Sequence, residues 1–178
     1  YWDISFPSAG SHDVVSRAEA EEGIREILDD AVAIRLRADV PVGAYLSGGL
    51  DSSILTALVK GHAPFMETFS VSFADPAYDE SPFQLAMGER LGTRHHVVRI
   101  SPGDIAEVFP QVVWQAETPV LRTAPAPMYL LSKLTRSCGI KVVLTGEGSD
   151  ELFGGYDIFK EAKIRRFWAR FPSSRLRP

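Results

Sequence analysis

Residues 42–53 read VGAYLSGGLDSS: a short apolar run, two glycines, and an acidic, hydroxyl-rich start to the next segment. An apolar run that enters a glycine turn and continues as a helix-forming segment predicts a strand, turn and helix. Such a turn places backbone N–H groups at the positive end of a helix, and the serine hydroxyls add donors, so a phosphate fits here. Asp51 would repel a bare phosphate, which predicts a Mg²⁺ ion between the two. The structural alternative is a helix capped by Ser or Asp after a tight turn.

A second loop, residues 145–151 (TGEGSDE), follows the apolar run 140–144 (IKVVL), which we predict to be a buried parallel strand. The loop carries the three acids Glu147, Asp150 and Glu151. Three carboxylates in five residues repel one another unless a cation or solvent reduces the repulsion. The loop is therefore either a second part of a cation-assisted phosphate site or an exposed acidic cap of the following helix.

Outward from these loops, helix-like and strand-like segments alternate along the chain. We expect helices over 16–38, 52–60, 80–91, 101–114 and 127–136, and strands over 42–46, 68–73, 95–100 and 140–144. This order predicts an α/β fold, an open parallel sheet with flanking helices. Both glycine loops should lie at carboxyl ends of strands, where such sheets bind ligands.

The composition is that of a folded domain: 178 residues, 45% hydrophobic and 24% charged. We expect a linker or arm over 1–15, the main domain over 16–160 and a basic tail over 161–178. The single cysteine, Cys138, excludes a disulfide framework, and no apolar run approaches the roughly 20 residues that span a bilayer. We therefore expect a cytoplasmic protein without a membrane partner. Because the chain begins without Met, we also expect a piece of something longer.

The net charge is −4, but the seven basic residues after position 159 face one acidic residue there. The rest of the chain is therefore strongly acidic, which argues against a nucleic-acid partner. The tail also carries Ile164, Phe167, Trp168 and Phe171 at helical spacing. This pattern predicts an amphipathic helix that packs on another surface, a reading that we favour over nucleic-acid or membrane binding.

Several familiar sites are excluded or disfavoured. The Walker pattern G-x-x-x-x-G-K-[ST] is absent, and Gly146-x-Gly148 lacks the third glycine of the dinucleotide fingerprint. His95 and His96 should point to opposite faces of a strand with no third ligand evident nearby, so we expect no metal there. Cys138 is expected to be a packed side chain rather than a nucleophile.

Two motifs carry a resemblance to a known family. Residues 47–52 (SGGLDS) resemble the SGGxDS loop of the ATP pyrophosphatases, and residues 145–156 (TGEGSDELFGGY) resemble the second signature of glutamine-dependent asparagine synthetases. With residues 68–73 (TFSVSF), Leu91-Gly92-Thr93 and Met128-Tyr129-Leu130, the likeness covers about 16–160. It implies the adenine nucleotide α-hydrolase-like (PP-loop) fold.

The resemblance also implies roles for individual residues. Asp51 and Asp150 would hold Mg²⁺, Glu147 and Asp150 would act at the reacting groups, and Glu151 would support the loop. ATP and its pyrophosphate would be bound by Tyr45, Leu46, Ser47, Gly48, Gly49, Asp51, Ser52, Ser53, Val71, Thr145 and Gly146.

The implied reaction is ATP-dependent amide formation. Aspartate would be activated as its β-aspartyl-adenylate and opened by ammonia, which a glutaminase domain absent from this chain would supply. The fragment alone should be nearly inactive. A related adenylating enzyme such as β-lactam synthetase and a noncatalytic adenine-nucleotide-binding module remain alternatives. The sequence leaves a homo-oligomer open.

Overall fold

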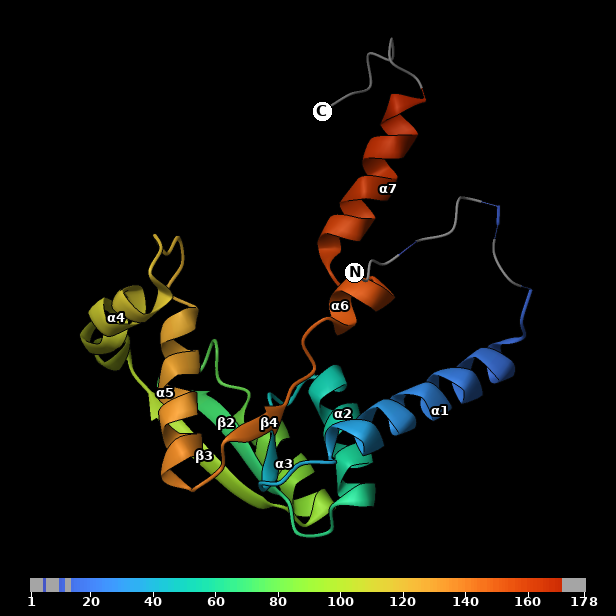
Figure 1. The fold of residues 1–178 in the computed structure, drawn as a ribbon. Coiled ribbons are helices and arrows are strands. Elements are labelled where there is room, and N and C mark those ends of the chain that lie inside the picture. Colours follow the sequence, from blue (N-terminus) through green and yellow to red (C-terminus); the bar gives the residue numbers. More distant parts are fainter. Residues whose placement is uncertain (1–4, 6–9, 12–13, 171–178) are drawn as a thin grey trace.

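The computed structural model describes residues 5, 10–11 and 14–170. Four strands alternate with helices along the chain (Figure 1). The elements in order are α1 (Arg17–Arg35), β1 (Val42–Tyr45), α2 (Leu50–His62), β2 (Glu67–Phe73), α3 (Ser81–Leu91), β3 (Arg94–Ile100), α4 (Pro102–Ala116), α5 (Pro125–Ser137), β4 (Val142–Leu144), α6 (Ser149–Phe153) and α7 (Asp157–Ala169).

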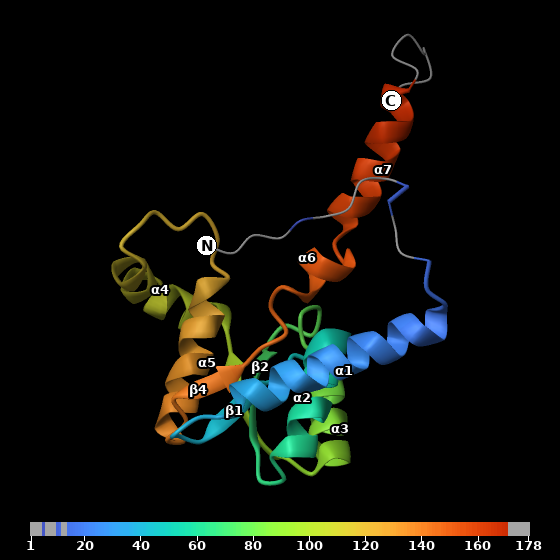
Figure 2. The same ribbon diagram turned by 45° about the vertical axis from the view of Figure 1, so that its right-hand side comes forward.

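The strands form one parallel sheet in the order β3-β2-β1-β4. The chain first adds strands on one side of β1 and then crosses over to place β4 on its other side. Helices α1, α2 and α3 lie on one face of the sheet, and α4 and α5 lie on the opposite face (Figures 1 and 2). The predicted open parallel α/β sheet with flanking helices is confirmed.

Each face of the sheet has its own apolar core, because successive side chains of a strand point to opposite faces. On the α1–α2 face, Val32, Ala44, Val59 and Met66 are buried together. On the α5 face, the buried cluster consists of Phe69, Leu131 and Ile140. The sheet therefore holds the carboxyl ends of β1 and β4 between two packed layers.

Two helix starts that the sequence indicated are stabilised by capping boxes. The Ser16 hydroxyl accepts a bond from the Glu19 N–H at 3.3 Å, and the Glu19 carboxylate accepts one from the Ser16 N–H at 2.8 Å. Ser101 and Asp104 make the same reciprocal pair at the start of α4. Such caps satisfy N–H groups that lack partners inside the helix.

The expectation of a buried strand over 140–144 is wrong in part. The strand is parallel, but only Val142–Leu144 pair with β1, and Val142 is 38% exposed. The reason is position: β4 is the last strand of the sheet, so only one of its sides has a neighbour. The apolar signal came partly from Ile140, which is buried in the α5-face core before the strand begins.

A helix is present in the tail as α7, which begins at Asp157 and so crosses the expected boundary at residue 160. The expectation that it is amphipathic is wrong, because its apolar side chains are distributed around the helix. It extends away from the sheet (Figure 2), and none of its residues is buried. Ile164, Phe167 and Trp168 are partly exposed at 49%, 61% and 39%, whereas Phe171 lies outside the described residues. Among the described helices, none is both long and apolar enough to cross a membrane.

Candidate functional site

The two glycine loops meet at the carboxyl edge of the sheet. The first leaves β1 and the second leaves β4, and these strands are neighbours at the point where the strand order reverses. A Cβ atom placed on Gly146 would lie 3.3 Å from Asp51 Cβ and 3.3 Å from the Ser52 nitrogen. The loops are therefore in close contact at the place where open α/β sheets bind ligands.

A pocket of about 510 Å³ opens between the loops. Of the residues expected to bind substrate or metal, those that line it are Tyr45, Leu46, Ser47, Asp51, Ser52, Val71, Thr145, Gly146, Glu147 and Asp150. The fold thus brings residues of both loops and of the carboxyl-terminal half of β2 to one cavity. Gly48, Gly49 and Ser53 are not among its lining residues.

The first loop is organised by hydrogen bonds around the buried Ser52 hydroxyl. Ser52 Oγ accepts a bond from the Ser47 N–H at 3.1 Å and donates to the Gly49 carbonyl at 3.2 Å. Its oxygen is also 2.9 Å from Ser47 Oγ, which accepts a bond from the Gly49 N–H at 3.3 Å. Ser53 Oγ donates to the Gly49 carbonyl at 2.7 Å. The turn is therefore preformed, and it leads into the first N–H groups of α2.

The second loop is partly exposed to solvent. Glu147 and Glu151 are exposed, Asp150 is half-buried, and α6 has no buried residue. Tyr156 Oη donates to Glu151 Oε1 at 3.1 Å. This hydrogen bond, followed by the charge of Glu151, raises the pKa of Tyr156, and the charges of Asp150 and Glu147 act in the same direction. The negative charges of the acidic loop therefore disfavour ionisation of the Tyr156 phenol.

The carboxylates of this pocket suit Mg²⁺ in kind and in number. Asp51 and Asp150 offer hard oxygen ligands to the same cavity. Within the described part of the chain, no three acids of this pocket come close enough together to form a complete protein cage. Mg²⁺ is usually held by one or two carboxylates together with substrate phosphates, so the residues present fit a metal that arrives with a nucleotide.

Sequence reasoning missed Gln84, a buried residue of α3 that lines the pocket. Its Nε2 donates to the carbonyls of Ser47 at 3.3 Å and Val71 at 2.9 Å, which joins the first loop to β2. A glutamine inside a helix carries no motif, so no sequence signal marked it. Tyr156 was visible as part of the second motif, but its contact with Glu151 depends on the fold.

Comparison with known proteins gives a family match over most of the chain. The family model described as "Asparagine synthase" matches residues 23–178. Asparagine synthetase [glutamine-hydrolyzing] 1 of Bacillus subtilis is 36% identical over 84% of this chain and 24% of its own length. Asparagine synthetase B of Escherichia coli is 37% identical over 78% of this chain and 28% of its own length.

A fungal relative, the amidase chyE of Penicillium rubens, is 39% identical over 90% of this chain and 26% of its own length. The chain therefore spans about a quarter of the length of these curated relatives.

Two solved structures share the fold at low identity. The NH3-dependent NAD synthetase of Campylobacter jejuni matches with a TM-score of 0.53 and 19% identity, over 76% of this chain and 60% of that one. The glutamine-dependent NAD+ synthetase of Acinetobacter baumannii, solved with ADP, matches with a TM-score of 0.51 and 19% identity, over 86% and 29%. These synthetases have the PP-loop adenine nucleotide α-hydrolase fold, and this chain shares it.

Proposed function

This chain belongs to the asparagine synthase family, and from that premise we propose that it forms the ATP-binding part of an amide-forming ligase. The observation that carries the proposal is the meeting of the SGGLDS and TGEGSDE loops around one pocket, with Asp51 and Asp150 both lining it. A glycine turn with backbone donors supplies a place for phosphates, and the two carboxylates supply ligands for their cation.

In this proposal the first loop holds the pyrophosphate part of ATP. The first N–H groups of α2 have no hydrogen-bond partners within the helix. They form its positive end, where a phosphate is stabilised. The Ser52 hydrogen bonds keep the turn in this shape before ATP arrives, so little order is lost on binding. Tyr45 and Val71, which line the same cavity, would contact the adenine.

Mg²⁺, when bound with the nucleotide, would offset the charge that develops on the departing pyrophosphate. Asp51 and Asp150 would hold it. Glu147 lies on the exposed side of the second loop, where it can orient the amino-acid substrate and its adenylate. The protein residues position groups and balance charge, and no protein nucleophile is needed.

The proposed chemistry begins with attack of a carboxylate oxygen of aspartate on the α-phosphorus of ATP. The bond to the bridging oxygen breaks and pyrophosphate leaves, which gives a β-aspartyl-adenylate. Ammonia then attacks the acyl carbon, AMP leaves, and asparagine forms with loss of a proton to solvent. The names of the Bacillus and Escherichia relatives favour aspartate as the acceptor. The Penicillium relative is called an amidase, a name that does not specify aspartate, so a different carboxylate acceptor is the second candidate.

Calorimetry tests nucleotide binding directly. ATP should bind the wild-type chain more tightly with Mg²⁺ than without it, and Asp51→Ala should remove most of that difference. Glu151→Gln is the matched control, because it neutralises a carboxylate of the same pocket to which we assign no role in metal binding. Equal ATP affinities with and without Mg²⁺ in the wild type would contradict the proposal.

Catalysis is tested separately, with aspartate, ammonia and Mg²⁺·ATP. We expect the 178-residue chain to make little asparagine compared with the Bacillus relative. Glu147 and Glu151 of the acidic loop are exposed and α6 has no buried residue, so water would reach an adenylate formed there. Comparable turnover by the two proteins would show that this chain alone completes the site. Pyrophosphate release that depends on a carboxylate other than aspartate would favour the other acceptor class.

A further inference from the structure

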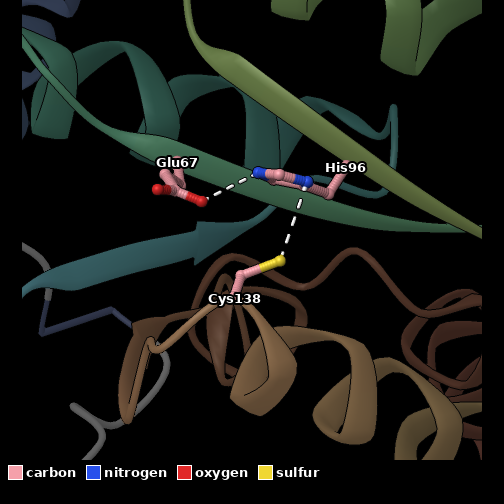
Figure 3. A group of neighbouring side chains, drawn as sticks. All are labelled: Glu67, His96 and Cys138. Atoms are coloured by element: carbon pink, nitrogen blue, oxygen red, sulfur yellow. Dashed lines mark hydrogen bonds and ion pairs between the residues drawn. The ribbon is translucent and has the colours of Figure 1, made fainter.

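Three chemically distinctive side chains meet away from the nucleotide pocket. Glu67 is the first residue of β2, His96 lies in β3, and Cys138 follows the last turn of α5. Figure 3 shows the imidazole of His96 between the carboxylate and the thiol. None of the three lines the nucleotide pocket, and the proposed ligase chemistry does not use them. They come from distant parts of the sequence, so only the fold brings them together.

The geometry of the group is well defined. His96 Nε2 is 2.8 Å from Glu67 Oε2, and His96 Nδ1 is 3.8 Å from Cys138 Sγ. The imidazole also stacks on the buried Phe69 ring, with centroids 5.1 Å apart and an interplanar angle of 13°. One potential ligand atom from each residue lies within 4.8 Å of the other two. The ring is thus held in place with a potential ligand at each nitrogen.

The donor set is one that zinc-class cations prefer. A thiolate, an imidazole and a carboxylate are all common zinc ligands, whereas Mg²⁺ favours oxygen ligands alone. Typical Zn–N and Zn–S bonds of about 2.0 and 2.3 Å place the two ligand atoms of a tetrahedral ion about 3.5 Å apart. The Nδ1–Sγ separation of 3.8 Å is close to that value. Glu67 contacts the other ring nitrogen, Nε2, so its carboxylate must leave that contact to reach the same ion. The ligand atoms of the three residues lie within 4.8 Å of one another, which keeps the carboxylate within reach.

The group is also accessible. The side chains of Glu67 and His96 are 23% and 19% exposed, and Cys138 is half-buried. Glu67 and Ile140 line a second pocket of about 310 Å³ at the edge of the sheet opposite to the nucleotide loops. Arg94 Nη1 lies 3.7 Å from Glu67 Oε1, but the Arg94 side chain is 76% exposed and can move away. Neither His96 nor Cys138 lines this pocket, so access of an ion to them rests on their own partial exposure.

We propose that Glu67, His96 and Cys138 form a binding site for one zinc-class divalent cation, separate from the nucleotide site. On binding, the thiol loses its proton to solvent and a sulfur–metal bond forms, with no change in oxidation state. The ion would connect the end of α5 to β2 and β3. The expectation that His96 has no third ligand nearby is therefore revised, because Glu67 and Cys138 supply ligands that the sequence did not reveal.

The single cysteine makes the test specific, because every thiol signal from the chain reports on Cys138. We would measure the rate of Cys138 alkylation with and without ZnCl2, in the absence of nucleotide. One equivalent of Zn²⁺ should slow alkylation at least tenfold, and a Mg²⁺ excess should leave the rate unchanged. No protection by Zn²⁺ in the wild type would overturn the proposal.

Variants then separate a three-ligand site from zinc binding by the thiol alone. Glu67→Gln and His96→Gln should each lose most of the protection. His95→Gln is the matched control, since His95 points to the other face of β3, where Nδ1 bonds Thr68. Circular dichroism checks that each variant folds. If His96→Gln does not fold, the nearly isosteric Glu67→Gln carries the comparison. Full protection in both ligand variants would contradict the site.

Cobalt provides a second measurement that does not depend on variants. Co²⁺ should bind the wild-type chain with one-to-one stoichiometry and give the visible absorption of a tetrahedral ion with a sulfur ligand. Excess Zn²⁺ should remove that absorption. Binding of one Co²⁺ per two chains, or an octahedral spectrum, would show that the three side chains do not form this site.

Discussion

The two loops of the pocket each carry two glycines, but they differ in charge and in the contacts that hold them. The first follows the central strand β1, and its turn is closed by the hydrogen bonds of the buried Ser52. The second follows the edge strand β4 and leads into α6, which has no buried residue. The first loop is therefore held by hydrogen bonds around one buried hydroxyl, whereas the second carries three carboxylates and leads into a helix without a buried residue. If the first loop binds phosphate as proposed, its hydrogen-bonded turn needs little reorganisation when the nucleotide arrives.

The largest difference between the loops should be in the stability lost when one glycine of each loop is replaced with Ala. Gly48 and Gly148 have positive φ values of 85° and 94°. A Cβ on Gly48 would also lie 3.1 Å from Phe83 Cβ, whereas one on Gly148 meets nothing within 4 Å. Backbone strain costs about 1 kcal/mol at each site, and crowding adds about 1–3 kcal/mol at Gly48 alone. Urea unfolding should rank Gly48→Ala as the more damaging change. Equal losses would mean that the first loop is not the more tightly packed.

The next effect concerns the hydroxyl that closes the first loop. Ser52→Ala removes the acceptor of the Ser47 N–H and should lower the free energy of unfolding by about 2 kcal/mol. Ser53→Ala removes a single bond to the Gly49 carbonyl near the surface and should cost about 0.5 kcal/mol. Thermal and urea unfolding of the two variants would measure the difference. A reversed order would place the organising hydroxyl at Ser53.

A smaller effect is expected in the second loop, on ligand binding rather than on stability. Asp150→Asn should weaken the Mg²⁺-dependent part of ATP affinity about tenfold, or about 1.4 kcal/mol, because one metal ligand loses its charge. Its unfolding midpoint should stay near the wild-type value, since Asp150 is only half-buried. Glu151→Gln serves as the control. If Glu151→Gln has the larger effect on ATP affinity, the metal assignment is wrong.

The smallest effect is electrostatic and concerns Tyr156. Its pKa is raised mainly by the hydrogen bond to Glu151 and by the charge of that residue, so Glu151→Gln should lower it toward the ordinary value of about 10. A raised folded-state pKa contributes stability below the ordinary pKa, and this contribution is lost as pH rises through the higher value. An ultraviolet pH titration, with Tyr156→Phe to identify the signal, would measure the shift. An unchanged titration would mean that the contact with Glu151 is not maintained in solution.

Local sequence patterns predicted the elements and their order because these depend on near neighbours. The apolar periodicity of α1 and the apolar run before Ser47 each act within a few residues. The two motifs also indicated several residues of the pocket, since loops after parallel strands meet at one edge of the sheet. The exposure of β4 could not be predicted, because a strand's place at the edge depends on the strand order.

The sequence by itself determined the fold class, the two glycine loops and the residue types that suit phosphate and Mg²⁺. Only the tertiary structure decided that Gln84 joins the first loop to β2, and that Glu67, His96 and Cys138 meet. The physical reason is sequence separation. Side chains far apart along the chain become neighbours only when strand register and helix packing set their positions, and no local pattern contains that information.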